Sequence, residues 1–494
     1  MSERTLEAQP SAHAPSEPGP STGPPAPWTL RLFARGHPGW ATTIGLLVLS
    51  AVIVFWADTR PGFDPYGWLV WGHQTTTLSL NTNAAPSWKP LPWVFTVPFA
   101  LAGHYQLHLW MITSVAISLS GVVFAARIAY RLTDAPAERR WAGLVAGAFA
   151  GIAVLGIQNY AHYVLSAQSD PMIVSLCLGA IDCHLSGRPR TAFLLGTLAS
   201  LGRPEVWPFL GLYSIWAWRT VPRSRVLLVA GWTAIVVFWF GVPAISSRSP
   251  FVAANNAMGS GRRLTSGQIT GTIKRFLAIN ELPVELAALL AVVLAAWRRN
   301  RVVLVLTAAT LTWVVIEVAF ALHGWPGLVR YMFEAGGVVV VLAGVAVGWL
   351  LSGSSKWPSL PASAASLAGW LGPALVVILV ASLIPAGISH ASAEHKDLRR
   401  QRARTAEINA LTPIVDRLGG VARLQACGEP LTRLAYQTML AYTLRINVNK
   451  VGFKYGQAIA HGNPIILFTP YPTKTGWVVK AIHQTNPSCR SLPH

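Results

Sequence analysis

The chain has 494 residues, of which 52% are hydrophobic and only 12% are charged, and its formal net charge is +20. So little charge would not cover the surface of a water-soluble protein of this length, and apolar runs of ~17–22 residues recur, the length that crosses a bilayer. The positive charge does not indicate nucleic-acid binding, because much of it lies in short loops between the apolar runs, where Lys and Arg set membrane orientation. The composition therefore predicts an α-helical polytopic protein of the cytoplasmic membrane.

The first 30 residues precede any apolar run and are rich in Pro, Ser and Ala. They lack the basic-then-apolar order of a cleavable signal peptide, so residues 1–30 are predicted to be a disordered tail. Arg31 and Arg35 stand just before the first span and place this tail in the cytoplasm. A transmembrane domain is predicted over residues 31–388.

Apolar runs predict membrane segments over residues 40–57, 107–131, 141–157, 168–186, 191–201 with 204–218, 225–244, 282–297, 301–322, 331–351 and 367–387. Short connecting loops that are rich in arginine are expected on the cytoplasmic side of the membrane. All of these loops fall on that side only if residues 191–218 enter the membrane and return to the same side. This predicts a helical hairpin with its tip at residues 202–205, where Pro204 breaks the helix. About eleven membrane segments result, with the C-terminus outside.

The first outer loop, residues 58–106, leaves the membrane directly after the first apolar run and carries Asp58 and Asp64. Asp64 is suited to catalysis and also to the start of a helix, since Asp caps a helix N-terminus and Pro65 fits the first turn; the two roles are compatible. Asp58 is better explained as an interfacial residue paired with Arg60. The loop also contains tryptophans that either anchor it at the interface or stack on a sugar, among them Trp68, Trp71 and Trp88.

Eight of the 19 acidic residues fall in the outer half of the predicted membrane domain or just beyond it: Asp58, Asp64, Asp170, Glu205, Glu281, Glu285, Glu317 and Glu334. Ionisable groups within spans are costly and tend to face a cavity or a partner, so this grouping predicts a polar cavity open to the outer leaflet. Among these residues, Asp170 is better explained as a helix cap than as a ligand, because it precedes a proline. The cations Lys89, Arg203 and Arg330 stand beside an aromatic residue or a proline on the same side, which suits a substrate with one anionic phosphate and a neutral hydroxyl partner.

Residues 389–494 are predicted to form a small extracytoplasmic α/β domain. A charged amphipathic helix is expected over residues 395–418, and short strands over residues 448–457, 464–472 and 476–485. Cys427 and Cys489 both lie here, and an oxidising compartment favours a disulfide between them. Cys177 and Cys183 lie within a span and are expected to be inert apolar residues.

Three short motifs resemble the GT-C superfamily of membrane glycosyltransferases, which use polyprenyl-phosphate sugars as donors. They are the acidic residue of the first outer loop (FDPYGW, with Asp64), the RPE turn (Arg203, Pro204, Glu205) and the RY pair that opens a late span (Arg330, Tyr331). The Ala-, Arg-, Trp- and Gly-rich composition also resembles actinobacterial members that build mannan or arabinan with decaprenyl-phosphate donors. The chain lacks an adjacent acidic pair in the first loop and a WWD-type sequence in the outer domain, so an oligosaccharyltransferase role is not expected.

The resemblance implies a GT-C-like fold and an inverting transfer of a sugar, with mannose or arabinofuranose expected, to an envelope glycan, glycolipid or protein outside the cytoplasmic membrane. A carboxylate would take the proton of the acceptor hydroxyl; Asp64 is the first candidate, followed by Asp58 and Glu205. The donor phosphate would be bound by cations of the same side and their aromatic neighbour, namely Lys89, Arg203, Arg330 and Tyr331.

No metal site or other cofactor is expected, because the sequence contains no HExxH, DxD or clustered His. Two other classes of protein fit the same outward cavity: a transporter or flippase of a lipid-linked glycan, and a non-catalytic scaffold of cell-wall assembly. Transporters commonly carry internal repeats, and the two halves of this chain show no convincing match.

Overall fold

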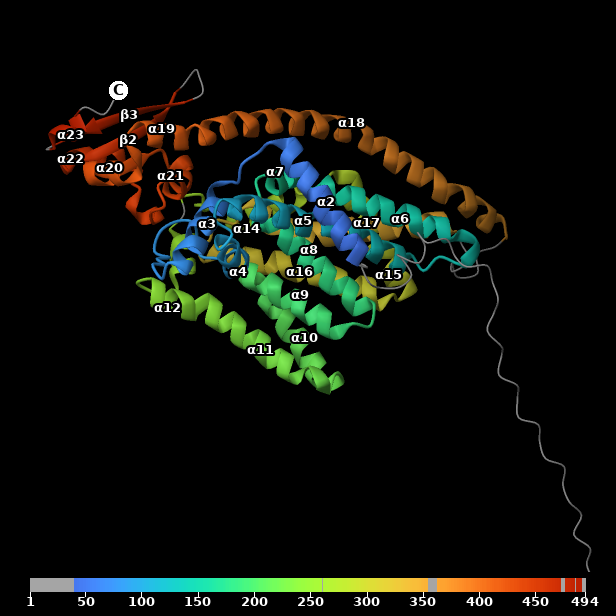
Figure 1. The fold of residues 1–494 in the computed structure, drawn as a ribbon. Helices are drawn as coiled ribbons and strands as arrows, with labels where there is room; N and C mark the ends of the chain where they lie inside the picture. The colour runs from blue at the N-terminus through green and yellow to red at the C-terminus, as the bar shows by residue number, and fades with distance from the viewer. Residues whose placement is uncertain (1–39, 260, 354–361, 472–475, 485, 491–494) are drawn as a thin grey trace, which may run out of the picture. The chain divides into compact units, whose positions relative to one another are not determined.

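The structure is a computed structural model that describes residues 40–259, 261–353, 362–471, 476–484 and 486–490. The predicted tail, residues 1–30, lies outside these ranges. The described part is mostly helical, and its three strands form one small sheet near the C-terminus (Figure 1).

Six helical stretches of the described residues are long and apolar enough to cross a membrane: Trp40–Ala57 (α2), Gly103–Thr133 (with α5, Gln106–Thr133), Pro222–Ser246 (α11, Arg225–Val236, to α12, Val242–Ser246), Arg301–Leu322 (α16), Val329–Ser352 (with α17, Phe333–Ser352) and Trp370–Arg417. A seventh arises if α14 (Gln268–Leu277) and α15 (Leu282–Arg298), bent by 93°, count as one span. The other predicted segments coincide with the shorter helices α6 (Arg140–Leu155), α8 (Ser169–Leu185), α9 (Pro189–Gly202) and α10 (Trp207–Thr220). The α-helical membrane class is thus supported, and the number of eleven segments stays a prediction.

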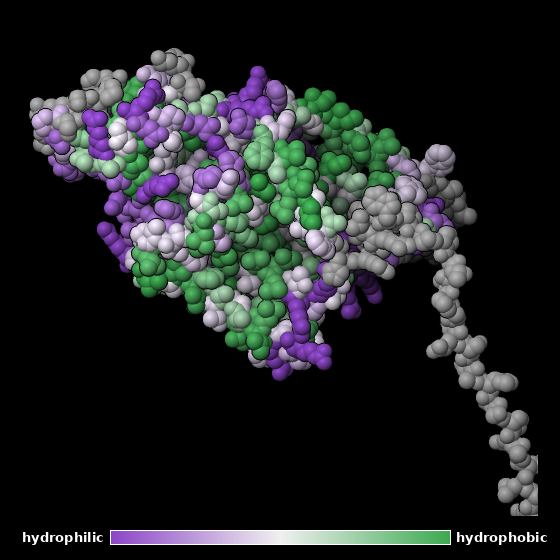
Figure 2. All heavy atoms as spheres, in the orientation of Figure 1, coloured by the Kyte–Doolittle hydropathy of each residue, from purple (hydrophilic) through white to green (hydrophobic). Residues whose placement is uncertain are grey.

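Helix α17 forms the centre of the bundle, packed against α5, α6, α8 and α15. Its glycines permit this, because a Cβ at Gly344 would lie 2.8 Å from the carbonyl oxygen of Ala146 on α6. Small residues let membrane helices approach closely, as here. By contrast, α2 and residues 370–388 of α18 (Ala362–Asn409) turn hydrophobic residues outward (Figure 2). Such a surface is stable in lipid, where apolar side chains need no cover.

The first outer loop folds into α3 (Phe63–Thr76) and α4 (Pro90–Ala100), which pack closely: a Cβ at Gly72 would lie 2.5 Å from the carbonyl oxygen of Thr96. The three tryptophans predicted to stack on a sugar form the core beneath this loop, with Trp68 and Trp71 0% exposed and Trp88 1% exposed. The rings of Trp71 and Trp88 lie 5.2 Å apart, and the indole of Trp88 donates to the carbonyl of Phe238. The sugar-stacking prediction is therefore wrong for all three, because other side chains already cover their faces.

The C-terminal part begins inside a continuous helix. Helix α18 runs from Ala362 to Asn409, through the boundary predicted at residue 389, and is followed by α19 (Leu411–Arg417) and α20 (Gly420–Cys427). The predicted charged helix over residues 395–418 is confirmed, but as the extension of the last apolar helix. The two parts are thus joined by helix rather than by a loop.

The small sheet has the order β1-β2-β3, with β1 (Glu429–Thr432) parallel to β2 (Ile465–Pro470) and β2 antiparallel to β3 (Trp477–Ile482). β2 and β3 confirm two predicted strands. The strand predicted over residues 448–457 is wrong: Asn447 caps a 3₁₀ turn there, and α22 (Tyr455–Ala460) follows. Helix α21 (Gln437–Thr443) packs on α3, and α23 (Pro487–Arg490) is joined to α20 by the predicted disulfide between Cys427 and Cys489.

Candidate active site

The predicted hairpin of α9 and α10 exists, and Arg203 stands at its tip. Helix α9 ends at Gly202, Arg203 is extended, Pro204–Val206 form a 3₁₀ turn, and α10 begins at Trp207. Tyr213 of α10 donates a hydrogen bond to the carbonyl of Pro189 at the start of α9 (3.3 Å), so α10 runs back along α9. The break leaves the carbonyl groups at the end of α9 without helical partners. The carbonyl of Ser200 accepts hydrogen bonds from the indoles of Trp207 and Trp239 instead.

Arg203 is held by carboxylates from three elements. Its guanidinium pairs with Asp170, with Glu205 (3.5 Å) and with Glu334 (3.3 Å), and its side chain is only 3% exposed. The guanidinium also lies 4.3 Å from the centre of the Tyr331 ring. A buried arginine needs such partners, because an unpaired charge in this environment would cost several kcal/mol. Arg203 is therefore fixed in place before any ligand binds.

Asp170 is the residue that links the cations. It lies in the first turn of α8, its side chain is 0% exposed, and it pairs with Arg203, with Arg330 (3.7 Å) and with Lys89 (3.8 Å). The ammonium of Lys89 also donates to the hydroxyl of Ser169 (3.2 Å). The sequence favoured a helix cap for Asp170, but its carboxylate makes no capping bond. Its predicted place on the outer side of the membrane domain, which it shares with Asp64, was the signal that could have identified it.

The accessible edge of this cluster consists of Asp64, Lys89 and Arg330, whose side chains are 22%, 16% and 14% exposed. Arg330 pairs with Asp64 at 3.2 Å, so the predicted RY pair and the predicted base are in contact. Two cations and one carboxylate give this edge a net positive charge. Burial lowers the pKa of Lys89, and the nearby carboxylate of Asp170 opposes that shift. A bound phosphate would favour the charged form of this lysine further.

Asp58 lies outside the cluster, exposed at the end of α2 with a positive φ of 48°. The pair predicted between Asp58 and Arg60 is also wrong, because the guanidinium of Arg60 donates to Asn409 (2.9 Å) and contacts His108. The left-handed backbone at Asp58 ends α2 and turns the chain toward α3. Asp58 therefore has no place in the site that the other residues form.

Of the remaining predicted carboxylates, Glu317 is buried on α16 and interacts electrostatically with Glu205. Glu281 and Glu285 make no ion pair within the described part of the chain. Four of the eight predicted residues thus converge directly on the three cations, namely Asp64, Asp170, Glu205 and Glu334.

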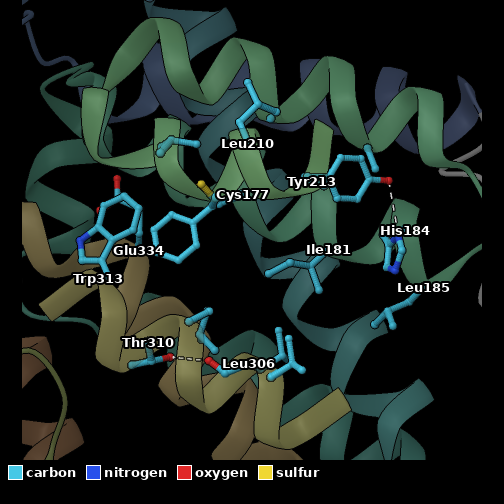
Figure 3. Close-up of a pocket in the computed structure, with 18 of the residues that line it drawn as sticks. Cys177, Ile181, His184, Leu185, Leu210, Tyr213, Leu306, Thr310, Trp313 and Glu334 are labelled. Atoms are coloured by element: carbon cyan, nitrogen blue, oxygen red, sulfur yellow. Dashed lines mark hydrogen bonds between the residues drawn. The ribbon is translucent and has the colours of Figure 1, made fainter. Parts of the chain in front are cut away.

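An apolar cavity of about 500 Å³ adjoins the cluster (Figure 3). Helices α8, α9, α10, α16 and α17 line it, mostly with aliphatic side chains. Glu334 and Trp313 lie at one end, and His184 and Leu185 lie at the other (Figure 3). The indole of Trp313 donates to the carbonyl of Tyr331 (2.9 Å), which links this end of the cavity to the RY pair. The size falls within the range of small-molecule sites.

The C-terminal part supports the helix that carries Asp64. The hydroxyl of Thr438 on α21 donates to the carbonyl of Phe63 (2.7 Å), immediately before Asp64. At the other end of α3, the amide of Asn447 donates to the side chain of Gln74 (2.9 Å). Both ends of α3 are thus held by residues from the end of the chain.

Two similar solved structures are of ArnT from Cupriavidus metallidurans. The one bound to undecaprenyl phosphate is 15% identical with a TM-score of 0.50, over 90% of this chain and 97% of that chain. The apo state is 16% identical with a TM-score of 0.50, over 88% of this chain and 93% of that chain. The sequence matches no family model and no curated protein, so the shared fold is what the comparisons establish.

Proposed function

We propose that the protein is an inverting GT-C-type glycosyltransferase that moves a sugar from a polyprenyl-phosphate donor to an acceptor hydroxyl on the outer face of the cytoplasmic membrane. The observation that carries the proposal is the contact between a long apolar cavity and a charged cluster that has two accessible cations and one accessible carboxylate. A donor of this class has the same two parts, an apolar chain and a phosphate.

The cavity suits the polyprenyl chain. Its lining on α16 extends from Arg301 to Trp313, twelve residue steps along the helix, which corresponds to roughly 18 Å. The chain would enter this cavity from lipid rather than from water, so its fit rests on close packing against the aliphatic lining. Glu334 lies both in the cavity wall and against Arg203, which brings the end of the chain to the cluster. The ArnT structure bound to undecaprenyl phosphate supports a donor of this kind.

Lys89 and Arg330 are the residues proposed to bind the donor phosphate, because they are the cations of the accessible edge. Charge-assisted hydrogen bonds from both would stabilise the negative charge that develops on the phosphate as the glycosidic bond opens. Arg203 is too buried to reach a ligand without losing its carboxylate partners. We therefore assign it to positioning: it holds Asp170, which in turn orients Lys89 and Arg330.

Asp64 is the proposed base. It is the most accessible carboxylate of the cluster, and Arg330 fixes its orientation. Its carboxylate would take the proton from the acceptor oxygen while that oxygen attacks the anomeric carbon and the phosphate leaves, which inverts the centre. Glu205 is only 2% exposed and pairs with Arg203, so its position fits a supporting role rather than that of the base.

The sugar is proposed to be mannose or arabinofuranose on a decaprenyl-phosphate donor, and the acceptor an envelope glycan, glycolipid or protein, as in the actinobacterial enzymes that the composition resembles. In this proposal the N-terminus lies in the cytoplasm and the C-terminal part outside. No cofactor is required, since the donor already carries a good leaving group.

The test uses purified protein in nanodiscs with radiolabelled decaprenyl-phosphate mannose and decaprenyl-phosphate arabinofuranose, and a membrane glycolipid extract as acceptor. Transfer of one sugar is expected. Lys89→Gln should raise the KM for that donor by about tenfold, because a charge-assisted hydrogen bond contributes about 1.5–3 kcal/mol. The matched control Lys396→Gln removes the same charge from an exposed position on α18 and should leave the KM unchanged. Movement of donor across the bilayer of proteoliposomes, without transfer in either preparation, would contradict the proposal and indicate a transporter or flippase. Donor binding with neither movement nor transfer would indicate a scaffold.

A further inference from the structure

A second cavity, of about 650 Å³, lies at the opposite end of the α9–α10 hairpin from Arg203. It is formed by the turn that precedes α9 and the turn that follows α10, with the lining residues Gly187, Arg188, Pro189, Arg190, Thr191, Thr220, Val221, Pro222 and Arg223. The 14 residues of α9 place it roughly 20 Å from the candidate active site. Arg131 at the end of α5 donates to Ser186 beside it (2.8 Å), so the loop between α5 and α6 lies at the same end.

Three of the lining residues are arginines, and none is acidic. The guanidinium of Arg190 donates to the carbonyl of Arg223 (3.2 Å), which links the two turns. The Nη2 atom of Arg188 is buried and has no hydrogen-bond acceptor among the described residues. A buried guanidinium nitrogen without an acceptor is unfavourable, which points to a ligand that supplies one. Backbone N–H groups in the first turn of α9 are also without helical partners and add positive partial charge.

Aromatic residues place the cavity at the edge of the hydrophobic surface. Trp216 and Trp218 on α10 are 40% and 45% exposed, one turn or less before Thr220. The ring of Trp218 lies 5.2 Å from the guanidinium of Arg225. Figure 2 shows hydrophilic residues at the turn between α10 and α11, beside the hydrophobic surface of these helices. Tryptophans are enriched at the membrane–water interface, so the cavity opens at the depth of lipid headgroups.

We propose that this cavity binds the phosphate of an anionic phospholipid headgroup. Guanidinium groups bind phosphate oxygens by paired, charge-assisted hydrogen bonds, and Arg188 has a buried donor free for that purpose. With three arginines and no carboxylate in the lining, a lipid of net negative charge is preferred over a zwitterionic one. Since the depth is that of headgroups, a lipid rather than free phosphate is the ligand. The proposal stands independently of the glycosyl-transfer reaction.

The experiment titrates dioctanoyl phosphatidylglycerol into the whole protein in detergent and follows binding by native mass spectrometry. Arg188→Gln and Arg223→Gln should each weaken binding about fivefold, and together about 25-fold, from the usual contribution of one basic residue to anionic lipid binding. Arg140→Gln is the matched control, because Arg140 is exposed at the same end and does not line the cavity. Its affinity should equal that of the unmodified protein. Arg188→Lys keeps the charge but loses the paired guanidinium donors, so its affinity should lie between those of the unmodified protein and of Arg188→Gln.

Three results would overturn the proposal. Equal affinity in the double variant and in Arg140→Gln would show that the cavity does not bind the headgroup. Equal binding of dioctanoyl phosphatidylcholine would exclude selection by net charge. Saturation by inorganic phosphate at concentrations similar to those of phosphatidylglycerol would show a site for a free anion rather than for a lipid. A melting curve for each variant establishes that any loss of binding arises in a folded protein.

Discussion

Replacing Asp64 or Asp170 by asparagine removes one negative charge from the same cluster, yet we expect opposite consequences. Asp170 is 0% exposed and pairs with three cations, and removing one charge of a buried pair costs about 3–5 kcal/mol of stability. Asp64 is 22% exposed and pairs with Arg330 alone, so its replacement should cost roughly 1 kcal/mol or less. Asp64→Asn should instead lower the transfer rate about 10²–10⁴-fold, the contribution of a general base.

The assay combines thermal unfolding in nanodiscs with kcat, KM and donor binding on the same preparations. Asp64→Asn should unfold close to the temperature of the unmodified protein, bind donor and transfer almost no sugar. Asp170→Asn should unfold at a much lower temperature and bind donor weakly, because Lys89 and Arg330 lose the group that orients them. Asp58→Asn is the matched control and should change neither property, since Asp58 is exposed and outside the cluster.

The reasoning would be refuted by either of two results. Full transfer activity in Asp64→Asn would move the base to another carboxylate, with Glu205 next in line. An unfolding temperature of Asp170→Asn equal to that of Asp58→Asn would mean that the three cations do not depend on Asp170 for their placement.

Three further predictions concern the framework and the cavity. Cys489→Ser removes the disulfide to Cys427, which closes a loop of 62 residues, and should destabilise the C-terminal part by about 4 kcal/mol. Limited proteolysis should be faster in this variant, and a reductant should have the same effect on the unmodified protein. Ala309→Phe places a ring in the apolar cavity and should raise the donor KM about tenfold, because overlap between the ring and the chain costs about 1–3 kcal/mol. A water-soluble short-chain donor should be unaffected. Gly72→Ala places a methyl group 2.5 Å from a backbone oxygen of α4 and should cost about 1–3 kcal/mol in thermal unfolding.

Matched controls separate these effects from general damage. Ala308→Phe adds the same ring beside Ala309 on the exposed side of α16 and should leave the donor KM unchanged. Gly45→Ala adds a methyl group where no atom lies within 4 Å and should not lower the unfolding temperature. Equal KM values in the two phenylalanine variants, or equal unfolding temperatures in the two alanine variants, would count against the packing described above.

The sequence predicted the parts of the site that a local pattern marks. Pro204 within an apolar run identifies the hairpin tip, and Arg330 at the start of a late span is a charge that needs a partner. Their positions follow from topology alone, because residues at outer span ends must share one side of the membrane. Asp170 was misjudged because SDP at a helix start has an adequate local explanation, and only the fold brings it to Arg203.

The tryptophans show the opposite error. Trp68, Trp71 and Trp88 stand in a polar loop, where exposure is the usual expectation, but α3 and α4 fold back so closely that all three are buried. Sequence patterns likewise do not separate full spans from shorter helices, since α6 and α8, both predicted as membrane segments, have 16 and 17 residues. Burial and crossing both depend on contacts between segments far apart in the chain.

The support of α3 by the last part of the chain has a consequence for biosynthesis. The contact between Thr438 and Phe63 joins residues 375 positions apart, and that between Asn447 and Gln74 joins residues 373 positions apart. The ribosome therefore completes every helix of the membrane bundle before the segment that braces α3 has been synthesised. We expect chains ended before Thr438 to bind donor and transfer no sugar, so that glycosyl transfer begins only once the whole polypeptide has been made.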